Sequence, residues 1–440
     1  MAEPTLILPR WVVPVEPDGV VLEHTAVVVR DARIEALLPA AEARQYFNAA
    51  DVVELPEHAL IPGLVNAHTH AAMALMRGLA DDLPLMRWLN EHIWPVEARH
   101  VTPEFVRDGT LLACAEMLRG GTTCFNDMYF YPEAALEAVH AAGMRAALGM
   151  IVVDFPTPYA SDADDYLQKG LALRDRYRDD PLVSFCLAPH APYTVSDDSF
   201  HKVAILAAEL DVPVHIHLHE TQDETDRSIA EHGVRPLERL RRLDLLGPNF
   251  IAVHAVHLLE DEIMLLSHHN ASVVHCPASN LKLASGFAPI ARLAAEGVNI
   301  ALGTDGAASN NRLDLFGEMR LAALLTKAVA GNAEAMPAHS AVRAATLGGA
   351  VALGLDASIG SIAPGKDADL VAVRLAGPEL SPCYDPVSHL VYAAGREHVS
   401  HVWVRGEPLV VAGTPRISAF EGLESRCDLW QNLIKAGPGY

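Results

Sequence analysis

The chain has 440 residues, of which 50% are hydrophobic types and 20% are charged, and its formal net charge is −23. This length and composition are typical of a globular protein that can bury a full barrel and a smaller module. The acidity argues against nucleic acid and anionic membranes as partners, because both bind basic surfaces, and it favours a small neutral or cationic substrate.

The sequence carries no signal that would direct it to a membrane or out of the cell. No apolar run approaches the roughly 20 residues needed to span a bilayer. Residues 1–10 lack the basic-then-apolar order of a secretory signal. The six cysteines show no paired spacing, which favours free thiols in a reducing compartment. We therefore expect a cytoplasmic protein.

The two ends of the chain are predicted to be rich in β-structure. Thr25–Arg30 is a β-type run, and near the C-terminus Asp369–Arg374 and His401–Gly406 have a similar β-type composition. Because the ends resemble each other more than either resembles the middle, we predict that residues 1–60 and 361–440 form one small composite β-sandwich domain.

Residues 61–360 alternate between strand-like and helical stretches. Eight strand-like pieces occur from Leu64 to Gly306. Such alternation predicts a parallel sheet, and closing eight strands gives an α/β fold, the (β/α)8 TIM-type barrel. The alternative is an open doubly wound sheet, but no Gly-x-Gly-x-x-Gly follows a strand to support its dinucleotide-binding version. We predict that the barrel is a metal-dependent catalytic domain.

Several of these strand-like pieces end in polar residues that suit metal binding. In a closed parallel barrel all strands deliver their C-terminal ends to one rim, so these residues should converge. His68 and His70 end the first strand, and because they are two residues apart their side chains point to the same side. Neutral imidazoles are good zinc or iron ligands.

A second histidine cluster ends another strand, where His215, His217 and His219 share one face. Three buried imidazoles need hydrogen-bond partners, so at least one should have a function. Position favours His217 or His219 over His215, because they lie nearer the rim. Glu220 follows directly; it could act as a general acid beside a metal, or it could open a solvated acidic run over residues 220–224.

Three further strand ends carry candidates. Asp305 follows an apolar run and would be costly to bury unless it is paired or binds a cation; the alternative is a helix N-cap. His254 could stabilise a tetrahedral intermediate or could be a core histidine. His190 could donate a hydrogen bond to a substrate nitrogen.

Taken together, the chain resembles the amidohydrolase superfamily and, within it, the 5-methylthioadenosine/S-adenosylhomocysteine deaminases. The resemblance covers nearly the whole chain. It rests on the motifs at residues 62–70, 88–97, 120–123, 215–220, 254–257, 275–282, 303–311 and 364–370.

The resemblance implies the roles of individual residues. His68, His70, His217 and Asp305 would hold one divalent ion, most often Zn²⁺, with Fe²⁺ or Mn²⁺ as alternatives. His217 is chosen over His219 because the family places its acidic residue three positions after the ligand. Glu220, His254 and Asp305 would be catalytic, and Glu97, His190, Glu220 and Asp305 would contact the substrate. His190 stands where other members carry a metal-bridging lysine, which indicates a single-metal site. Arg145 matches an arginine common in this group, without an assigned contact.

The implied reaction is hydrolytic deamination of the 6-amino group of an adenine nucleoside: 5′-methylthioadenosine, S-adenosylhomocysteine or adenosine. Glu97 would accept hydrogen bonds from the ribose. One alternative keeps the fold but acts on a triazine or a free nucleobase, by dechlorination or deamination. Another is a barrel retained for binding without catalysis. We also expect a homo-oligomer.

Overall fold

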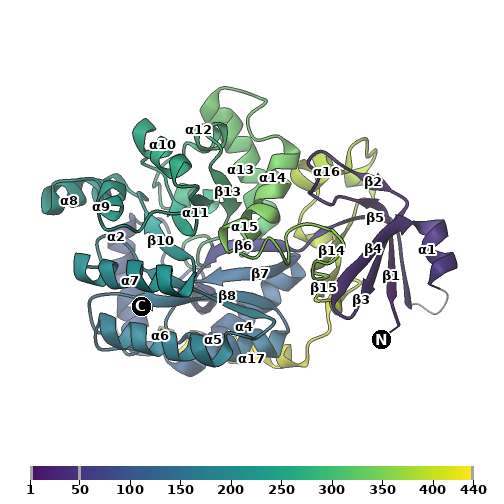
Figure 1. Cartoon of the computed structure of the whole chain (residues 1–440). Coiled ribbons are helices and arrows are strands. Elements are labelled where there is room, and N and C mark those ends of the chain that lie inside the picture. Colours follow the sequence, from purple (N-terminus) through teal and green to yellow (C-terminus); the bar gives the residue numbers. More distant parts are fainter. Residues whose placement is uncertain (1–2, 48–50, 438–440) are drawn as a thin grey trace.

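The computed structural model describes residues 3–47 and 51–437, and it divides into a barrel and a separate sheet (Figure 1). The barrel sheet has eight parallel strands in sequence order from β6 to β13. Their bounds are β6 (Leu64–Thr69), β7 (Thr122–Asp127), β8 (Arg145–Val152), β9 (Val183–Pro189), β10 (Val214–Leu218), β11 (Phe250–His254), β12 (Ser272–His275) and β13 (Asn299–Leu302). The predicted (β/α)8 architecture is confirmed.

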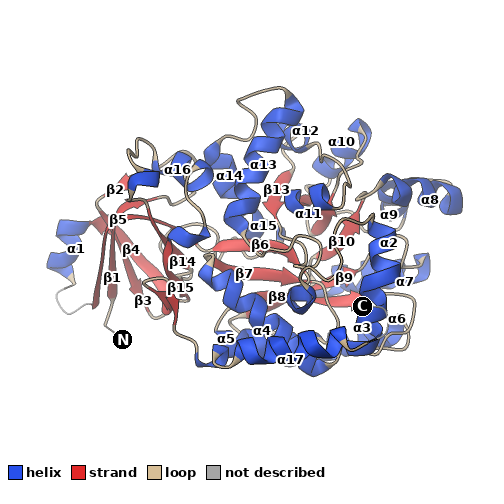
Figure 2. Cartoon of the chain, turned by 180° about the vertical axis from the view of Figure 1, so that it is seen from behind, coloured by secondary structure: helices blue, strands red, loops and turns tan. Residues whose placement is uncertain are grey.

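Helices cover the outside of this sheet (Figure 2), so both faces of its strands are buried. This explains why the barrel strands are continuous apolar runs rather than alternating ones. The helices that follow the strands are α4 (Pro103–Arg119), α5 (Pro132–Ala142), α6 (Ala163–Tyr177), α7 (Asp197–Leu210), α8 (Gln222–His232), α9 (Pro236–Arg242), α10 (Glu260–His268), α11 (Pro277–Lys282), α12 (Ile290–Ala295), α13 (Leu315–Ala330), α14 (Ala338–Ala344) and α15 (Leu347–Ala352).

Side chains and loop backbone join the first and last barrel strands. The Asn66 amide donates to Thr304 Oγ1 at 2.7 Å and accepts from the Thr304 backbone N–H at 2.9 Å. The Asp305 backbone N–H donates to the His68 carbonyl at 3.1 Å. These contacts nearly close the barrel and bring His68 and Asp305 together, although they are far apart along the chain.

The second sheet is built from both ends of the chain, as predicted (Figure 1). Its nine strands run in the order β17-β16-β15-β14-β5-β1-β3-β4, with β2 paired to β1. The bounds are β1 (Thr5–Val12), β2 (Leu22–Glu23), β3 (Thr25–Arg30), β4 (Arg33–Pro39), β5 (Asp51–Pro62), β14 (Leu370–Arg374), β15 (Val399–Val404), β16 (Glu407–Val411) and β17 (Thr414–Pro415). The domain boundaries at residues 60 and 360 stay a prediction.

The chain passes from this sheet into the barrel at Gly63, the only residue between β5 and β6. A Cβ atom at this position would lie 1.9 Å from Thr123 Oγ1, so only glycine lets β6 lie against β7 here. The remaining α-helices are α1 (Ala40–Tyr46), α2 (Leu85–Trp88), α3 (Trp94–His100), α16 (Pro386–Tyr392) and α17 (Leu423–Lys435). Helix α17 packs on α4 outside the barrel (Figure 2).

A buried ionic network joins the two modules and explains Arg145. Its guanidinium donates to Asp369 at 3.0 Å and to Asp367 at 2.8 Å, and it also donates to the Pro181 carbonyl. Arg405 pairs with the same Asp367 carboxylate at 2.9 Å. Arg145 begins β8, so it lies at the end of the barrel away from the strand tips, where contacts serve stability rather than chemistry.

Two global expectations can be compared with the structure. All six cysteines are free thiols, as predicted, and four of them are buried. Among the described residues, no helix has both the length and the apolar character needed to cross a membrane.

Candidate active site

The C-terminal ends of β6 and β10 and the residue cluster after β13 bring four potential metal ligands together. His68 is in β6, His70 directly follows it, His217 is in β10, and Asp305 follows β13. One ligand atom from each lies within 4.8 Å of all the others. His68, His217 and Asp305 are buried, and His70 is nearly so.

Hydrogen bonds at the outer ring nitrogens determine where the imidazoles present lone pairs. His70 Nδ1 contacts the Met128 carbonyl at 2.6 Å, and His217 Nδ1 contacts the His190 carbonyl at 2.8 Å. Because a carbonyl only accepts, both Nδ1 atoms carry the proton, and both Nε2 atoms present lone pairs to the cluster. This tautomer is the one that metal-binding histidines adopt.

The third imidazole is oriented by another histidine. His68 Nδ1 lies 3.0 Å from His215 Nε2. When His68 donates in this pair, its own Nε2 also presents a lone pair to the cluster. His68 Nε2 is 3.2 Å from His217 Nε2 and 3.3 Å from Asp305 Oδ1, which is equally 3.3 Å from His70 Nε2.

These separations suit a cation. Ligands about 2.0–2.1 Å from a tetrahedral zinc ion stand about 3.4 Å apart. Without a positive charge between them, three lone pairs and a carboxylate would repel one another. The donor set of three imidazoles and one carboxylate therefore fits a divalent ion of the zinc type.

The electrostatics of Asp305 also indicate a need for positive charge. Burial would raise the pKa of this carboxyl, but contacts with His68 and His70 hold it well below its usual range. Burial lowers the pKa of His68 to about 4, whereas the hydrogen bond and charge of Asp305 overcome burial and raise the pKa of His70 to about 9. A cation among the ligands would satisfy the same charge demand.

Two serines that the sequence analysis did not identify orient Asp305. The hydroxyls of Ser279 and Ser309 each donate to Asp305 Oδ2 at 2.6 Å, and the Gly306 backbone N–H donates to Oδ1 at 2.8 Å. Asp305 adopts a φ of 59°, which turns the chain after β13 toward the rim. Its carboxylate thus serves the cluster rather than a helix N-cap.

His215 in β10 and His219 just after it do not join the ligand cluster with His217. His215 supports His68, as described above. His219 has a φ of 53°, and its Nε2 accepts from the Leu237 backbone N–H at 3.2 Å, outside the four-ligand cluster. Of the three alternating histidines, only His217 contributes to the four-ligand group found among the described residues.

Glu220 is buried rather than solvated, and Glu224 holds the backbone next to it. The backbone N–H groups of His219 and Glu220 donate to the two oxygens of Glu224, both at 2.9 Å. Burial raises the pKa of Glu224 to about 8 against the opposing effect of these donors. Burial also raises the pKa of Glu220, and the nearby His254 opposes this shift. Glu220 is thus suited to carry a transferable proton.

His254 lies beside Glu220. Its Nδ1 is 2.8 Å from Asn280 Oδ1, and its Nε2 is 3.8 Å from Glu220 Oε2. Because the Asn280 oxygen only accepts, Nδ1 carries a proton, and Nε2 faces the acid. Neither Asn280 nor Glu224 was identified from the sequence, although both lie in segments that the sequence analysis had marked.

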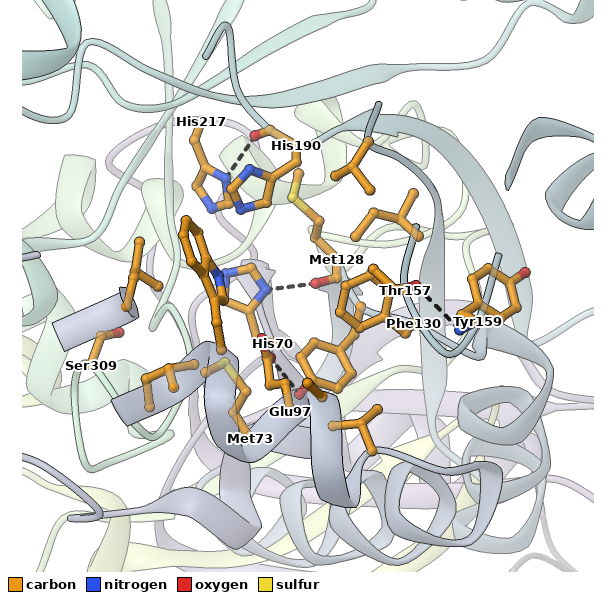
Figure 3. Close-up of a pocket in the computed structure, with 18 of the residues that line it drawn as sticks. His70, Met73, Glu97, Met128, Phe130, Thr157, Tyr159, His190, His217 and Ser309 are labelled. Carbon is orange, nitrogen blue, oxygen red and sulfur yellow. Dashed lines mark hydrogen bonds between the residues drawn. The ribbon is translucent and has the colours of Figure 1, made fainter. Parts of the chain in front are cut away.

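One cavity of about 420 Å³, a size typical of small-molecule sites, is lined by His70, His217, Glu220, His254 and Asp305 (Figure 3). His190 and Glu97 also line it. Burial lowers the pKa of His190 to about 3, so the ring is neutral. Burial raises the pKa of Glu97 to about 7, although the Tyr129 hydroxyl donates to it at 2.7 Å.

The structure therefore places every predicted site residue at this cavity or in the ligand cluster next to it. Trp88 and Phe155 also line the cavity, whereas Met86 is not among its described lining residues. Figure 3 shows His217 and His190 at one side, His70 in the middle and Tyr159 at the other side.

Comparison with known proteins identifies the fold and its family. The amidohydrolase family matches residues 59–409. The chain belongs to the amidohydrolase family. The predicted resemblance is confirmed, and this amidohydrolase is a hydrolase, as expected.

Individual relatives cover nearly the full length of this amidohydrolase. It is 48% identical to a 5-methylthioadenosine/S-adenosylhomocysteine deaminase of Saccharophagus degradans, over 98% of this chain and 97% of that protein. A solved adenosine deaminase from Xanthomonas campestris with bound zinc shares 52% identity over 98% and 99% of the two chains, with a TM-score of 0.97. An atrazine chlorohydrolase of Arthrobacter aurescens TC1 reaches a TM-score of 0.90, covering 97% and 99%, but is 24% identical, which shows the fold alone.

Proposed function

We propose that this amidohydrolase is a metal-dependent deaminase that converts the 6-amino group of adenine nucleosides, with 5′-methylthioadenosine and S-adenosylhomocysteine as the substrate class and adenosine as a further candidate. The observation that carries the proposal is one cavity joining the four-ligand cluster to a buried acid, Glu220, and to a second carboxyl group, Glu97. The relatives named above support the same reaction.

His68, His70, His217 and Asp305 would hold one divalent ion, which would supply Lewis-acid activation of a water molecule. Zinc is proposed over iron and manganese because imidazole nitrogens and a carboxylate oxygen are usual zinc ligands, and because the 52% identical adenosine deaminase from Xanthomonas campestris was solved with bound zinc. The metal content of purified protein tests this choice. Iron or manganese as the activity-supporting ion would contradict it.

The chain's own residues would move the protons. Asp305 accepts a proton from the attacking water as its oxygen bonds to C6. Glu220, in its acid form, donates a proton to ring nitrogen N1. His254 stabilises the negative charge on the oxygen that attacks C6, beside Glu220. The 6-amino group then takes the proton held by Asp305, the C6–N bond breaks and ammonia leaves. The hydroxyl on C6 returns its proton to Glu220 as the C6=O bond forms, so that one water is consumed and one ammonia is released.

Glu97 and His190 would position the nucleoside. The Glu97 carboxyl lines the cavity and accepts a hydrogen bond from Tyr129, leaving its second oxygen for the ribose hydroxyls. His190, neutral and buried, can donate to a purine nitrogen through Nε2 in the tautomer whose Nδ1 accepts from the Thr194 hydroxyl, 3.1 Å away. With the ribose at Glu97 and C6 at the ligand cluster, the adenine ring would lie between the two.

The decisive experiment supplies zinc-loaded protein with adenosine, the two thioether nucleosides, free adenine and a chlorinated triazine. We expect ammonia release and the ultraviolet shift from adenine to hypoxanthine with nucleosides only. Glu97→Ala should raise KM for nucleosides, because the ribose loses its acceptor. Turnover of triazine or free adenine without any nucleoside activity would replace this proposal with the alternative substrates.

We further propose that the enzyme works in the cytoplasm as a homo-oligomer. The free, largely buried thiols support a reducing compartment. Phe287 and Val329 are 58% and 49% exposed and lie at the same small surface cavity, which supports an apolar contact between copies. Light scattering on the purified enzyme tests the second point, and a monomer at micromolar concentration would contradict it.

A further inference from the structure

One wall of the cavity is almost entirely apolar. Trp88 and Ile93 come from the segment that spans α2 (Leu85–Trp88) and the π-helical turn η2 (Leu89–Ile93), before α3 (Trp94–His100). Phe130 follows β7, and Phe155 and Tyr159 follow β8. Figure 3 shows Phe130 and Tyr159 on the side of the cavity opposite Ser309.

No lysine or arginine is found among the described residues that line the cavity. Two cations lie behind lining residues, and both are engaged. Lys169 donates to the Tyr159 carbonyl at 2.5 Å and pairs with Asp165 at 3.0 Å. The Arg227 guanidinium stands 5.8 Å from the Tyr193 ring and 3.8 Å from Glu231. Neither extends an unpaired charge into the cavity.

The chain around this wall is acidic. Asp154 precedes the wall segment at residues 155–159, and Asp162, Asp164 and Asp165 follow it. Asp154 accepts from Ser199 and Asp162 caps α6, whereas Asp164 and Asp165 pair with Lys202 and Lys169. A substrate carboxylate brought to this wall would find no lysine or arginine among the described lining residues, and Asp154 and Asp162, which flank the wall segment in the sequence, add negative charge to this part of the chain.

We propose that this wall selects the 5′ substituent of the nucleoside: a small uncharged thioether, as in 5′-methylthioadenosine, over the amino-acid tail of S-adenosylhomocysteine. The inference rests on the proposed function, because C6 at the ligand cluster and the ribose at Glu97 leave this wall for the 5′ end. A thioether sulfur packs well against aromatic rings. The tail's carboxylate would lose water without gaining a partner.

The first test measures kcat/KM of the zinc-loaded wild-type enzyme for 5′-methylthioadenosine, S-adenosylhomocysteine and adenosine. We expect the methylthio nucleoside to exceed S-adenosylhomocysteine by on the order of 100-fold. Equal or higher kcat/KM for S-adenosylhomocysteine would overturn this inference and leave the deaminase proposal intact. Absence of turnover with all three would overturn both.

A second test adds a cation to the wall. Phe155 is 42% exposed, so Phe155→Arg should fold, and melting temperature checks this. The variant should raise the ratio of kcat/KM for S-adenosylhomocysteine over 5′-methylthioadenosine by at least about tenfold, because the tail carboxylate gains a partner. Phe155→Leu, the matched apolar control, should leave the ratio near the wild-type value. An unchanged ratio in Phe155→Arg would show that the 5′ end does not reach this wall.

Discussion

Asp305 illustrates how single side chains are prepared for their task before any ligand arrives. One of its oxygens faces two imidazoles at 3.3 Å, and the other accepts from two serine hydroxyls at 2.6 Å. A carboxylate with both oxygens occupied cannot rotate without losing hydrogen bonds. Such support of a ligand usually affects affinity for the metal more than it affects folding.

Ser279→Ala is therefore expected to weaken zinc binding by about 10- to 100-fold, since Asp305 loses one of its two orienting donors. Competition with a chromophoric chelator measures the affinity. Ser267→Ala serves as the control, because the Ser267 hydroxyl on α10 donates to the carbonyl of Glu296, which directly follows α12, and neither residue lines the cavity. Equal zinc affinity in Ser279→Ala and wild type would count against an orienting role.

Glu220, unlike the proposed metal ligand Asp305, is proposed to donate a proton, so its protonation state decides whether it can act. Because burial raises its pKa, the acid form persists to higher pH than for an exposed glutamate. In the proposed mechanism the acid form is the proton donor, so kcat should be level at low pH on this limb and should fall as pH rises through the raised pKa. Glu220→Gln should retain zinc but lose about 10²–10⁴-fold in kcat. The residual kcat of Glu220→Gln should not fall over the same pH range. If it does, the fall in the wild-type kcat belongs to another group.

At the scale of elements, the strand ends could be read from the sequence, and their supports could not. An apolar run ending in His-x-His or Asp predicts which backbone reaches the rim, because all parallel strands end on one side. The choice between His217 and His219 depended on resemblance, since both share a face of the predicted strand. The left-handed backbone at His219, which removes it from the cluster, has no local sequence signal.

Supports such as Ser279, Asn280 and Tyr129 depend on contacts between elements. Ser279 reaches Asp305 from α11, Asn280 reaches His254 from the same helix, and Tyr129 reaches Glu97 from the loop after β7. Hydroxyl and amide groups are common on surfaces, so their types alone could not distinguish these residues from solvated ones.

The contact between the two modules makes a separate prediction. Arg145→Leu leaves two buried aspartates without one of their cationic partners, which should lower the free energy of unfolding by about 3–5 kcal/mol. Urea denaturation measures the change, and kcat of the folded protein should stay near wild type because Arg145 lies at the opposite end of the barrel. Arg241→Leu removes an exposed pair with Glu238 and should leave stability unchanged. Comparable effects of the two changes would contradict a structural role for the buried network.

At the scale of the whole molecule, the proposed ion would bind across the place where the barrel nearly closes. His68 and His70 come from its first strand region, and Asp305 follows its last strand. An ion held by both should stabilise the folded chain by about 4 kcal/mol when free zinc is 1,000 times its dissociation constant. Chelation should lower the melting temperature, and added zinc should restore it.

The matched control for this experiment is His217→Ala, which removes one ligand and so should melt at nearly the same temperature with and without chelator. His268→Ala, which changes an exposed histidine at the end of α10, should respond as wild type does. A wild-type melting temperature that is insensitive to chelation, in protein shown to have lost its zinc, would contradict the link between the ion and the fold.

The position of β5 between strands from the two ends of the chain has a consequence for biosynthesis. β5 pairs with β14, which the ribosome produces some three hundred residues later. During translation, one side of β5 must therefore wait without its neighbour while the whole barrel is made. We expect nascent chains stalled before β14 to expose this strand edge and to recruit chaperones, and release of the C-terminal strands to end that exposure.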